Sequence, residues 1–272
     1  MGAFYRENTS IFYGLYNALL RTQDSSQNLY QKVLEAQQQF FINQNENTDG
    51  KFQDTVCELL DEALHKFYIG SYILEQLWGV HDFLKNTNDD ISQLVNEQIT
   101  SRSNSIEFLL SILLDQSLYS WRSFLDYYFK YLLFFITGKY ILTMSTKEFW
   151  KIFNGYIENN PEDEKAKMVL NYIKNKVLHE KEDRSNLIWG DLLKSLRDKT
   201  THQKLIKPTV IENENRSGFI ISWPTIAGQN YSELVQCNFE NNAFYMFTDL
   251  FPFLYGFDWV SGPFRSGMFK KT

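Results

Sequence analysis

Residues 105–137 read SIEFLLSILLDQSLYSWRSFLDYYFKYLLFFIT, and this stretch decides the fold. Leu, Ile, Phe and Tyr occur on nearly every face of a helix drawn through it. A helix that is apolar all round has to be covered by other elements. Its most apolar part, 124–136, contains Asp126 and Lys130 and is shorter than the roughly 20 apolar residues of a membrane-spanning helix. We therefore expect 105–137 to be the central buried helix of a helical bundle.

Two upstream stretches also show helical periodicity. Apolar residues recur at helical spacing over about 8–43 and again over about 52–84. The polar segment between them, QNENTDG, is typical of a surface loop, so the two stretches are expected to form an antiparallel helical pair. A second polar break, KNTNDD at 85–90, precedes further helix from about Ile91. We assign residues 1–104 to an N-terminal helical region.

Downstream of the central helix, local signals predict where shorter helices begin. Gly138 is expected to end the central helix. Ser145 and Glu148 then have the spacing of a capping box before the helix KEFWKIFNGYI. The sequence NPEDE at 160–164 predicts the next start, with Asn160 as the cap. Its acidic run suits a helix dipole, and we interpret it as a helix start rather than a metal site.

Two helices complete this part of the chain. The helix that starts in NPEDE is expected to reach about Leu178, and Ser185 is expected to open another, NLIWGDLLKSLRD. Leucine and isoleucine side chains supply the apolar face of this last helix, at Leu187, Ile188, Leu192, Leu193 and Leu196. Residues 105–207 are therefore assigned to one helical bundle.

At Pro208 the sequence pattern changes from helical to strand-like. The runs PTVIE and GFIISW flank NENRS and predict a β-hairpin, with SELVQCN as a candidate third strand. An aromatic-rich helix is expected over about 241–250, and Pro252 is expected to stop it. Residues 208–272 should pack on the bundle as a hairpin and a C-terminal helix. The predicted fold class is mainly α: a helical bundle with a small C-terminal β-hairpin or three-stranded sheet.

Composition narrows the classes of function. The 272 residues are 43% hydrophobic and 17% aromatic, which supplies enough large side chains to build a core. A net charge of −6 draws the chain neither to nucleic acid nor to anionic membranes, so any such binding must rest on a local patch. Cys57 and Cys237 are too few for a disulfide framework, and the N-terminal MGAFYREN lacks a secretory pattern. These features predict a cytoplasmic protein that does not bind membranes.

Most catalytic motifs are missing from the sequence. It contains no GxxxxGK[ST], GxGxxG or HExxH pattern, no nucleophile elbow and no cysteine knuckle. This argues against P-loop enzymes, most metalloproteases and nucleotide-cofactor oxidoreductases. His65 and His81 lie on predicted amphipathic helices and are interpreted as structural or surface residues. His179, followed by Glu180 at a helix end, either complements the helix dipole or forms an auxiliary acid–base pair.

The segment RDKTTH, from Arg197 to His202, is the most concentrated candidate site. Arg197 offers a planar charged fork for phosphate oxygens, and the His202 imidazole can accept or donate a proton near neutral pH. The segment 194–207 is basic within an acidic protein, since it contains several cations and only one carboxylate, Asp198. Besides Arg197, these cations are Lys194, Lys199, Lys204 and Lys207. Such a patch suits RNA phosphates.

The same segment resembles the signature of the HEPN domains, all-helical modules of which many are metal-independent ribonucleases in bacterial toxin–antitoxin and antiviral systems. Their motif is an Arg followed after four to six residues by His, commonly with Asn, Asp or His next to the Arg. Arg197, Asp198 and His202 match it, and the resemblance covers about 105–207.

This resemblance implies an endoribonuclease that acts as a toxin or antiviral-defence effector and needs no metal or other cofactor. His202 would transfer a proton during attack of the 2′-hydroxyl, Arg197 would stabilise the phosphate charge, and Asp198 would orient the pair. The lysines at 194, 199, 204 and 207 would bind RNA. The family pattern also implies a homodimer and, as a further partner, an antitoxin or sensor protein.

Helical geometry restricts how this site can be built. Residues five apart lie roughly 140° apart around an α-helix, so Arg197 and His202 cannot share a face of one straight helix. A common site needs a helix break, which Thr200 and Thr201 before Pro208 favour, or a second subunit. The alternative is that RDKTTH only ends a helix, in a non-catalytic scaffold or partner-binding protein whose aromatic run FYMFTDLFPFLYGFDW is the docking face.

Overall fold

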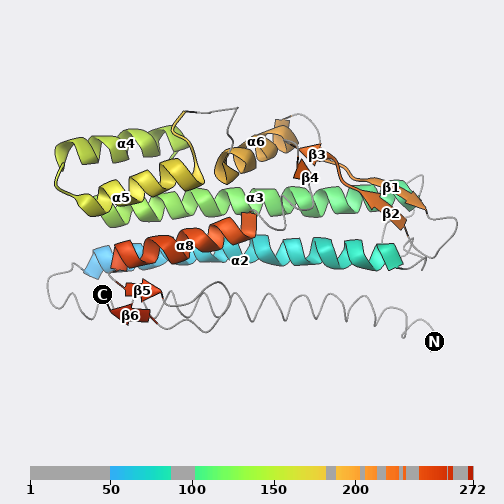
Figure 1. The fold of residues 1–272 in the computed structure, drawn as a ribbon, viewed down its shortest axis with the longest axis horizontal. Helices are drawn as coiled ribbons and strands as arrows, with labels where there is room; N and C mark the ends of the chain where they lie inside the picture. The colour runs from blue at the N-terminus through green and yellow to red at the C-terminus, as the bar shows by residue number, and fades with distance from the viewer. Residues whose placement is uncertain are drawn as a thin grey trace.

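The described part of the chain is dominated by two long helices. The computed structural model describes residues 50–86, 102–181, 188–202, 206–212, 219–226, 229–230, 239–255, 257–259 and 269–271. Helices α2 (Gly50–Asn86) and α3 (Arg102–Thr137) run side by side in opposite directions (Figure 1). Their contact is the most extensive between any two described elements. The predicted helices over 8–43 and from Ile91 lie outside the described residues.

Helix α3 is the central helix, as its all-round apolar surface predicts. It packs against α2, α4, α6 and β1. Three of its aromatic side chains, Trp121, Tyr128 and Tyr131, are fully buried. Gly138, with φ of 67°, follows its last residue at the predicted end. None of the helices in the described ranges combines the length and apolar character needed to cross a bilayer.

A glycine lets α2 and α3 approach closely. A Cβ atom built at Gly70 would lie 2.9 Å from Cε2 of Trp121, so the indole rests directly against the α2 backbone. Phe67, one turn earlier, meets the same indole edge-on with ring centroids 5.2 Å apart. Glycine in a helix interior costs about 1 kcal/mol relative to alanine. Its presence here is explained by the tryptophan that it accommodates.

Helices α4 (Thr146–Asn159) and α5 (Glu164–Tyr172) follow. The predicted capping box before α4 is confirmed, since Ser145 and Glu148 each bond the other's backbone N–H. The predicted cap of α5 is wrong. Asp163 begins that helix by accepting a hydrogen bond from the Ala166 N–H at 2.9 Å. Asn160 instead ends α4, where its backbone and side-chain N–H groups donate to carbonyls of the last turn.

A π-helical turn, η2 (Ile173–Val177), extends α5 to nearly the predicted end and meets the start of α6 (Trp189–His202). A Cβ atom at Gly190 would overlap the backbone carbonyl oxygen of Val177. The first turn of α6 therefore packs backbone to backbone against the end of η2. The predicted cap at Ser185 lies outside the described residues.

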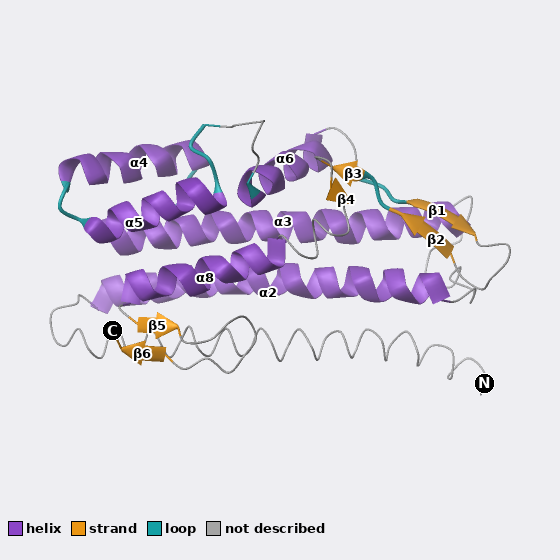
Figure 2. Cartoon of the chain, viewed as in Figure 1, coloured by secondary structure: helices purple, strands orange, loops and turns teal. Residues whose placement is uncertain are grey.

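The C-terminal part contains short antiparallel pairs around one helix. The predicted hairpin is confirmed by strands β1 (Thr209–Glu212) and β2 (Phe219–Ser222), whose register pairs Val210 with Ile221. Both of these side chains are buried, and the Val210 N–H donates to Glu107 of α3 at 3.1 Å. Two further pairs are β3 (Thr225–Ile226) with β4 (Gln229–Asn230) and β5 (Phe257–Trp259) with β6 (Phe269–Lys271). Every described sheet has two strands (Figure 2), and SELVQCN lies outside the described residues.

Helix α8 (Glu240–Tyr255) continues through Pro252, so the predicted stop is wrong. A proline inside a helix removes a backbone hydrogen bond and costs roughly 3 kcal/mol. Burial of the last turn offsets this cost. Leu254 and Tyr255 are buried, and the Tyr255 hydroxyl hydrogen-bonds the buried Tyr131 hydroxyl of α3 at 2.6 Å.

The packing at Gly70 predicts opposite effects for two glycine substitutions in α2. Gly70→Ala should lower the free energy of unfolding by roughly 1–3 kcal/mol, because the new methyl group collides with Trp121. Gly79→Ala is the matched control, since no described atom lies within 4 Å of a Cβ there. It should raise stability by about 0.5–1 kcal/mol. Urea unfolding followed by circular dichroism measures both, and equal shifts would contradict the packing argument.

The approach of Gly190 to Val177 predicts a second contrast. Gly190→Ala should lower the melting temperature by about 2–6 °C, since α6 must move away from η2 or strain its backbone. In Gly155→Ala, within α4, the added methyl meets no described atom within 4 Å. Scanning calorimetry should show an unchanged or higher melting temperature for this control. A Gly190→Ala protein as stable as its parent would show that the two backbones are not in contact.

Candidate functional site: a lysine-lined cleft between α4 and α6

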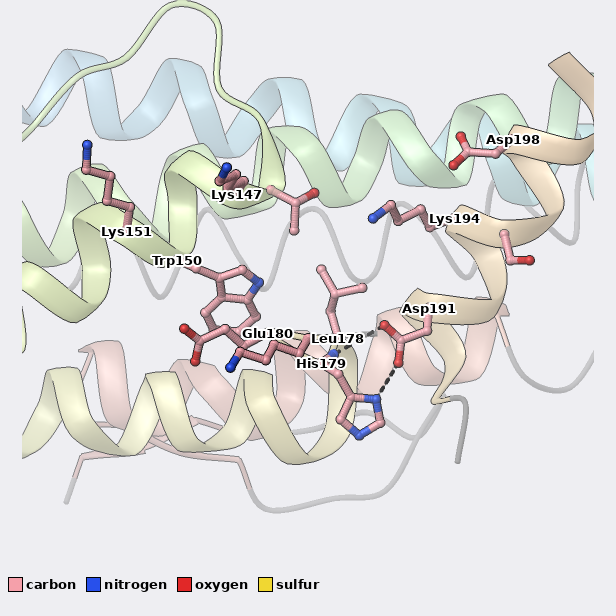
Figure 3. A pocket seen from close by; sticks show the side chains of 12 residues that line it. Lys147, Trp150, Lys151, Leu178, His179, Glu180, Asp191, Lys194 and Asp198 are labelled. Atoms are coloured by element: carbon pink, nitrogen blue, oxygen red, sulfur yellow. Dashed lines mark hydrogen bonds and ion pairs between the residues drawn. The ribbon is translucent and has the colours of Figure 1, made fainter. Parts of the chain in front are cut away.

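A cleft of about 650 Å³ lies between the first two turns of α4, residues 178–181 and one face of α6 (Figure 3). Pockets for small ligands commonly measure about 300–1,000 Å³, so it can hold a group the size of a nucleotide. On α6 its lining residues are Asp191, Lys194, Ser195 and Asp198. Their spacing places them on one face of the helix.

Four lysines and three carboxylates line the cleft. Lys147 and Lys151 come from α4, Lys181 follows η2, and Lys194 comes from α6. In Figure 3, Lys194 extends from α6 toward the first turn of α4, where Lys147 lies. Neither Lys147 nor Lys194 has a hydrogen bond or an ion pair with any residue that the structure describes. An acidic chain thus carries unneutralised positive charge at this cleft.

The carboxylates of the cleft are, in contrast, already engaged. Glu180 accepts from Lys174 at 2.9 Å and from Asn154 at 3.0 Å, and the hydrogen bond from Lys174 is the main cause that lowers its pKa. Asp198 lies 3.6 Å from Arg197, and Asp191 is bound by His179. The cations around the cleft therefore outnumber the carboxylates that are free to attract them.

His179 is paired with Asp191 rather than with Glu180, its neighbour in the sequence. Its Nδ1 lies 2.5 Å from Asp191 Oδ2, and its backbone N–H donates to Oδ1 at 3.3 Å. Asp191 is almost fully buried, so this double contact fastens the end of η2 to the first turn of α6. In Figure 3 the imidazole lies on the far side of the Asp191 carboxylate from Lys194. The pair therefore braces one end of the cleft.

Of the two arrangements that could bring Arg197 and His202 together, a helix break or a second subunit, the helix break does not occur. The backbone of α6 remains helical from Trp189 to His202. The β-branched Thr200 and Thr201 lower helix propensity only slightly, which is too little to end the helix. Arg197 and His202 therefore stay on different sides of α6, roughly 140° apart.

Arg197 and Asp198 form an ion pair at 3.6 Å, but only one of them belongs to the cleft. Asp198 lines the cleft, whereas Arg197 does not. The Arg197 side chain is 33% exposed, and its charge acts on the carboxyl group of Asp126 in α3. Burial raises the pKa of Asp126, and the nearby charges of Arg122, Lys130 and Arg197 oppose that rise. Arg197 thus pairs with Asp198, and Asp126 forms an ion pair with Arg122 at 2.9 Å.

Of the four lysines predicted to bind RNA, Lys194 is the one that the structure places in the cleft. Lys194 lines the cleft, and Lys207 is exposed just before β1. The side chains of Lys199 and His202 and the whole of Lys204 lie outside the described residues. By helical position His202 follows Asp198 after four residues, on the face of α6 that lines the cleft. Their catalytic and RNA-binding roles stay predictions.

No motif in the sequence marks the residues of α4 that line the cleft. Lys147 and Lys151 are four residues apart, so one face of that helix was visibly basic. Nothing local indicated that this face would lie opposite α6, because only packing on α3 brings the two helices together.

Neither a cluster of metal ligands among the described residues nor similarity to a known protein indicates what the cleft binds. Within the described ranges, no three His, Cys, Asp or Glu side chains are grouped as metal ligands. No protein-family model, curated protein or solved structure matches the chain.

Proposed function

We propose that this protein is a metal-independent endoribonuclease, acting as a toxin or antiviral-defence effector. One observation carries the proposal. A single unbroken helix, α6, forms one wall of a lysine-lined cleft and also contains the R-D-x3-H segment. RNA carries one negative charge per phosphate, and lysines that neutralise these charges supply affinity without sequence preference. A strand held at the cleft would therefore lie beside the segment.

The proposed reaction is an internal transesterification. The 2′-oxygen forms a bond to the adjacent phosphorus while the bond to the 5′-oxygen breaks, leaving a 2′,3′-cyclic phosphate and a 5′-hydroxyl. His202 takes the 2′-hydroxyl proton or protonates the leaving 5′-oxygen, and solvent water makes the other of these two proton transfers. Arg197 stabilises the added negative charge on the phosphate. Asp198 orients these groups by hydrogen bonding. Protons and charge balance without a metal ion.

The unbroken helix makes a second copy of the chain part of this proposal. Because Arg197 and His202 lie on different sides of α6, one chain cannot direct both at one phosphate. A homodimer with α6 near its two-fold axis would instead combine Arg197 of one subunit with His202 of the other. The resemblance to HEPN domains implies a homodimer with its site across the two-fold axis, each subunit contributing one motif.

The alternative is a non-catalytic helical protein that binds a partner, and the surroundings of Arg197 favour it. Arg197 is not among the residues that line the cleft, and its charge helps to oppose the rise in the pKa of the Asp126 carboxyl group that burial causes. An arginine that serves to balance a partly buried carboxylate would leave Asp198 and His202 without a phosphate-binding partner. RNA cleavage and subunit mixing separate the two functions.

The first test is cleavage of total RNA in EDTA. Wild-type protein should cleave it, and Arg197→Ala and His202→Ala should each reduce the rate by roughly 10²- to 10⁴-fold. His65→Ala, on an exposed position of α2, is the matched control and should keep full activity. Absence of wild-type cleavage, or equal activity in all four proteins, would remove the ribonuclease assignment. Loss of activity in His179→Ala but not in His202→Ala would move the proton-transfer role to the other end of α6.

The second test asks whether each site is shared between subunits. Arg197→Ala and His202→Ala chains are coexpressed, so that about half of the dimers contain one of each. If the site combines residues of two subunits, each mixed dimer keeps one intact site, and about a quarter of the wild-type activity should return. If both residues of one chain act together, the mixture should be as inactive as either variant alone.

A further inference from the structure

We propose that the mouth of the cleft between α4 and α6 binds the phosphate groups of an RNA strand, with Lys147 and Lys194 as its principal charged donors. These lysines come from opposite walls of the cleft, and both are exposed. Only Lys194 belongs to the basic segment seen in the sequence. The identification of RNA rests on the proposed function, whereas phosphate binding can be measured without any cleavage.

The charge distribution selects an anion. Lys147 and Lys194 have no hydrogen-bonding or ionic partner among the residues described. The nearby carboxylates have theirs: Glu180 is held by Lys174, Asp191 by His179 and Asp198 by Arg197. A cationic ligand would have to displace these contacts. An anion placed between the two lysines needs no rearrangement of the carboxylates and gains two charge-assisted hydrogen bonds.

Neutral donors at the same place suit a phosphate group, which has several oxygens to satisfy. Thr146 and Ser195 belong to the lining, one from each wall, and the Thr146 hydroxyl, which accepts from Arg122 at 3.0 Å, keeps its own proton to donate. Trp150 is only 4% exposed, and its indole N–H has no hydrogen-bond partner among the described residues. Figure 3 shows this nitrogen on the side of the ring that faces α6. An indole can only donate, so the cleft offers donors to a ligand rich in acceptors.

Helix α6 links this binding site to the R-D-x3-H segment. Lys194 and His202 are eight residues apart, which corresponds to about 12 Å along the helix axis. A nucleic-acid strand in a duplex advances about 3.4 Å per nucleotide, so a few nucleotides cover this distance. A strand anchored at Lys147 and Lys194 can thus lie along α6 with a later phosphate near its C-terminal end. This extent favours an RNA strand over a free nucleotide.

Binding is tested with a fluorescently labelled 2′-O-methyl oligoribonucleotide, whose blocked 2′-oxygens cannot attack phosphorus. Fluorescence anisotropy is measured for wild-type protein, Lys147→Gln, Lys194→Gln and the matched control Lys139→Gln, an exposed lysine outside the cleft. Each cleft variant should raise Kd by about five- to tenfold and reduce the slope of log Kd against log salt by about 0.7. Lys139→Gln should leave both unchanged. Equal urea midpoints confirm that all four proteins are folded.

Two further measurements identify the site and the source of the phosphate. The indole N–H resonance that disappears in Trp150→Phe should shift when the oligonucleotide is added to wild-type protein. Inorganic phosphate and AMP, titrated as competitors, should displace the oligonucleotide only at concentrations far above its Kd. Displacement at concentrations near that Kd would overturn the assignment to an RNA strand in favour of a free phosphate ester.

The outcomes keep the binding site and the ribonuclease function apart. Binding that depends on Lys147 and Lys194, without cleavage of total RNA, supports the site and removes the catalytic function. Cleavage of RNA by a protein whose oligonucleotide Kd is the same in all variants supports the catalytic function and overturns the site. Failure of the oligonucleotide to bind wild-type protein at low salt would also overturn the proposed binding site.

Discussion

The close approach of α2 and α3 is the constraint on which the rest of the structure depends. The indole of Trp121 rests against the backbone at Gly70, so α2 covers one side of the central helix closely. Helices α4 and α6 and strand β1 cover the sides of α3 that α2 leaves uncovered. Because α4 and α6 cover different stretches of the same helix (Figure 1), the cleft between them follows from how α3 is buried.

A second contact between backbones fixes the geometry of the cleft. At Gly190 the first turn of α6 meets the end of the π-turn at Val177, and the pairing of His179 with Asp191 closes the same junction. An ordinary side chain at Gly190 would separate the two elements. A turn of π-helix often marks a functional region, and here it places the chain so that His179 reaches the start of α6. The junction explains why Asp191 is engaged while Lys194, one turn later, faces the open cleft.

Much of the fold could be predicted because its strongest signals are local. The all-round apolar surface of α3, the capping box before α4 and the hairpin of β1 and β2 are readable from short stretches of sequence. The wrong predictions arose where neighbouring caps compete or where a distant contact outweighs local preference. Asn160 and Asp163 are both good caps, and the choice between them depends on where α4 ends. Pro252 fails to stop α8 because the buried pair of Tyr131 and Tyr255 holds the last turn.

The candidate site was predictable only in part, for a related reason. Its basic segment is continuous in the sequence, but Lys147 and Trp150 meet Lys194 only through packing on α3. The charge of Arg197 likewise acts on Asp126, which lies 71 residues earlier and could not be connected with it from the sequence. Because α6 is unbroken, the position of each residue of the R-D-x3-H segment in the helix fixes the face on which it lies. With Asp198 and the position of His202 on the cleft face and Arg197 on another, the unbroken helix does not place Arg197 and His202 on one face.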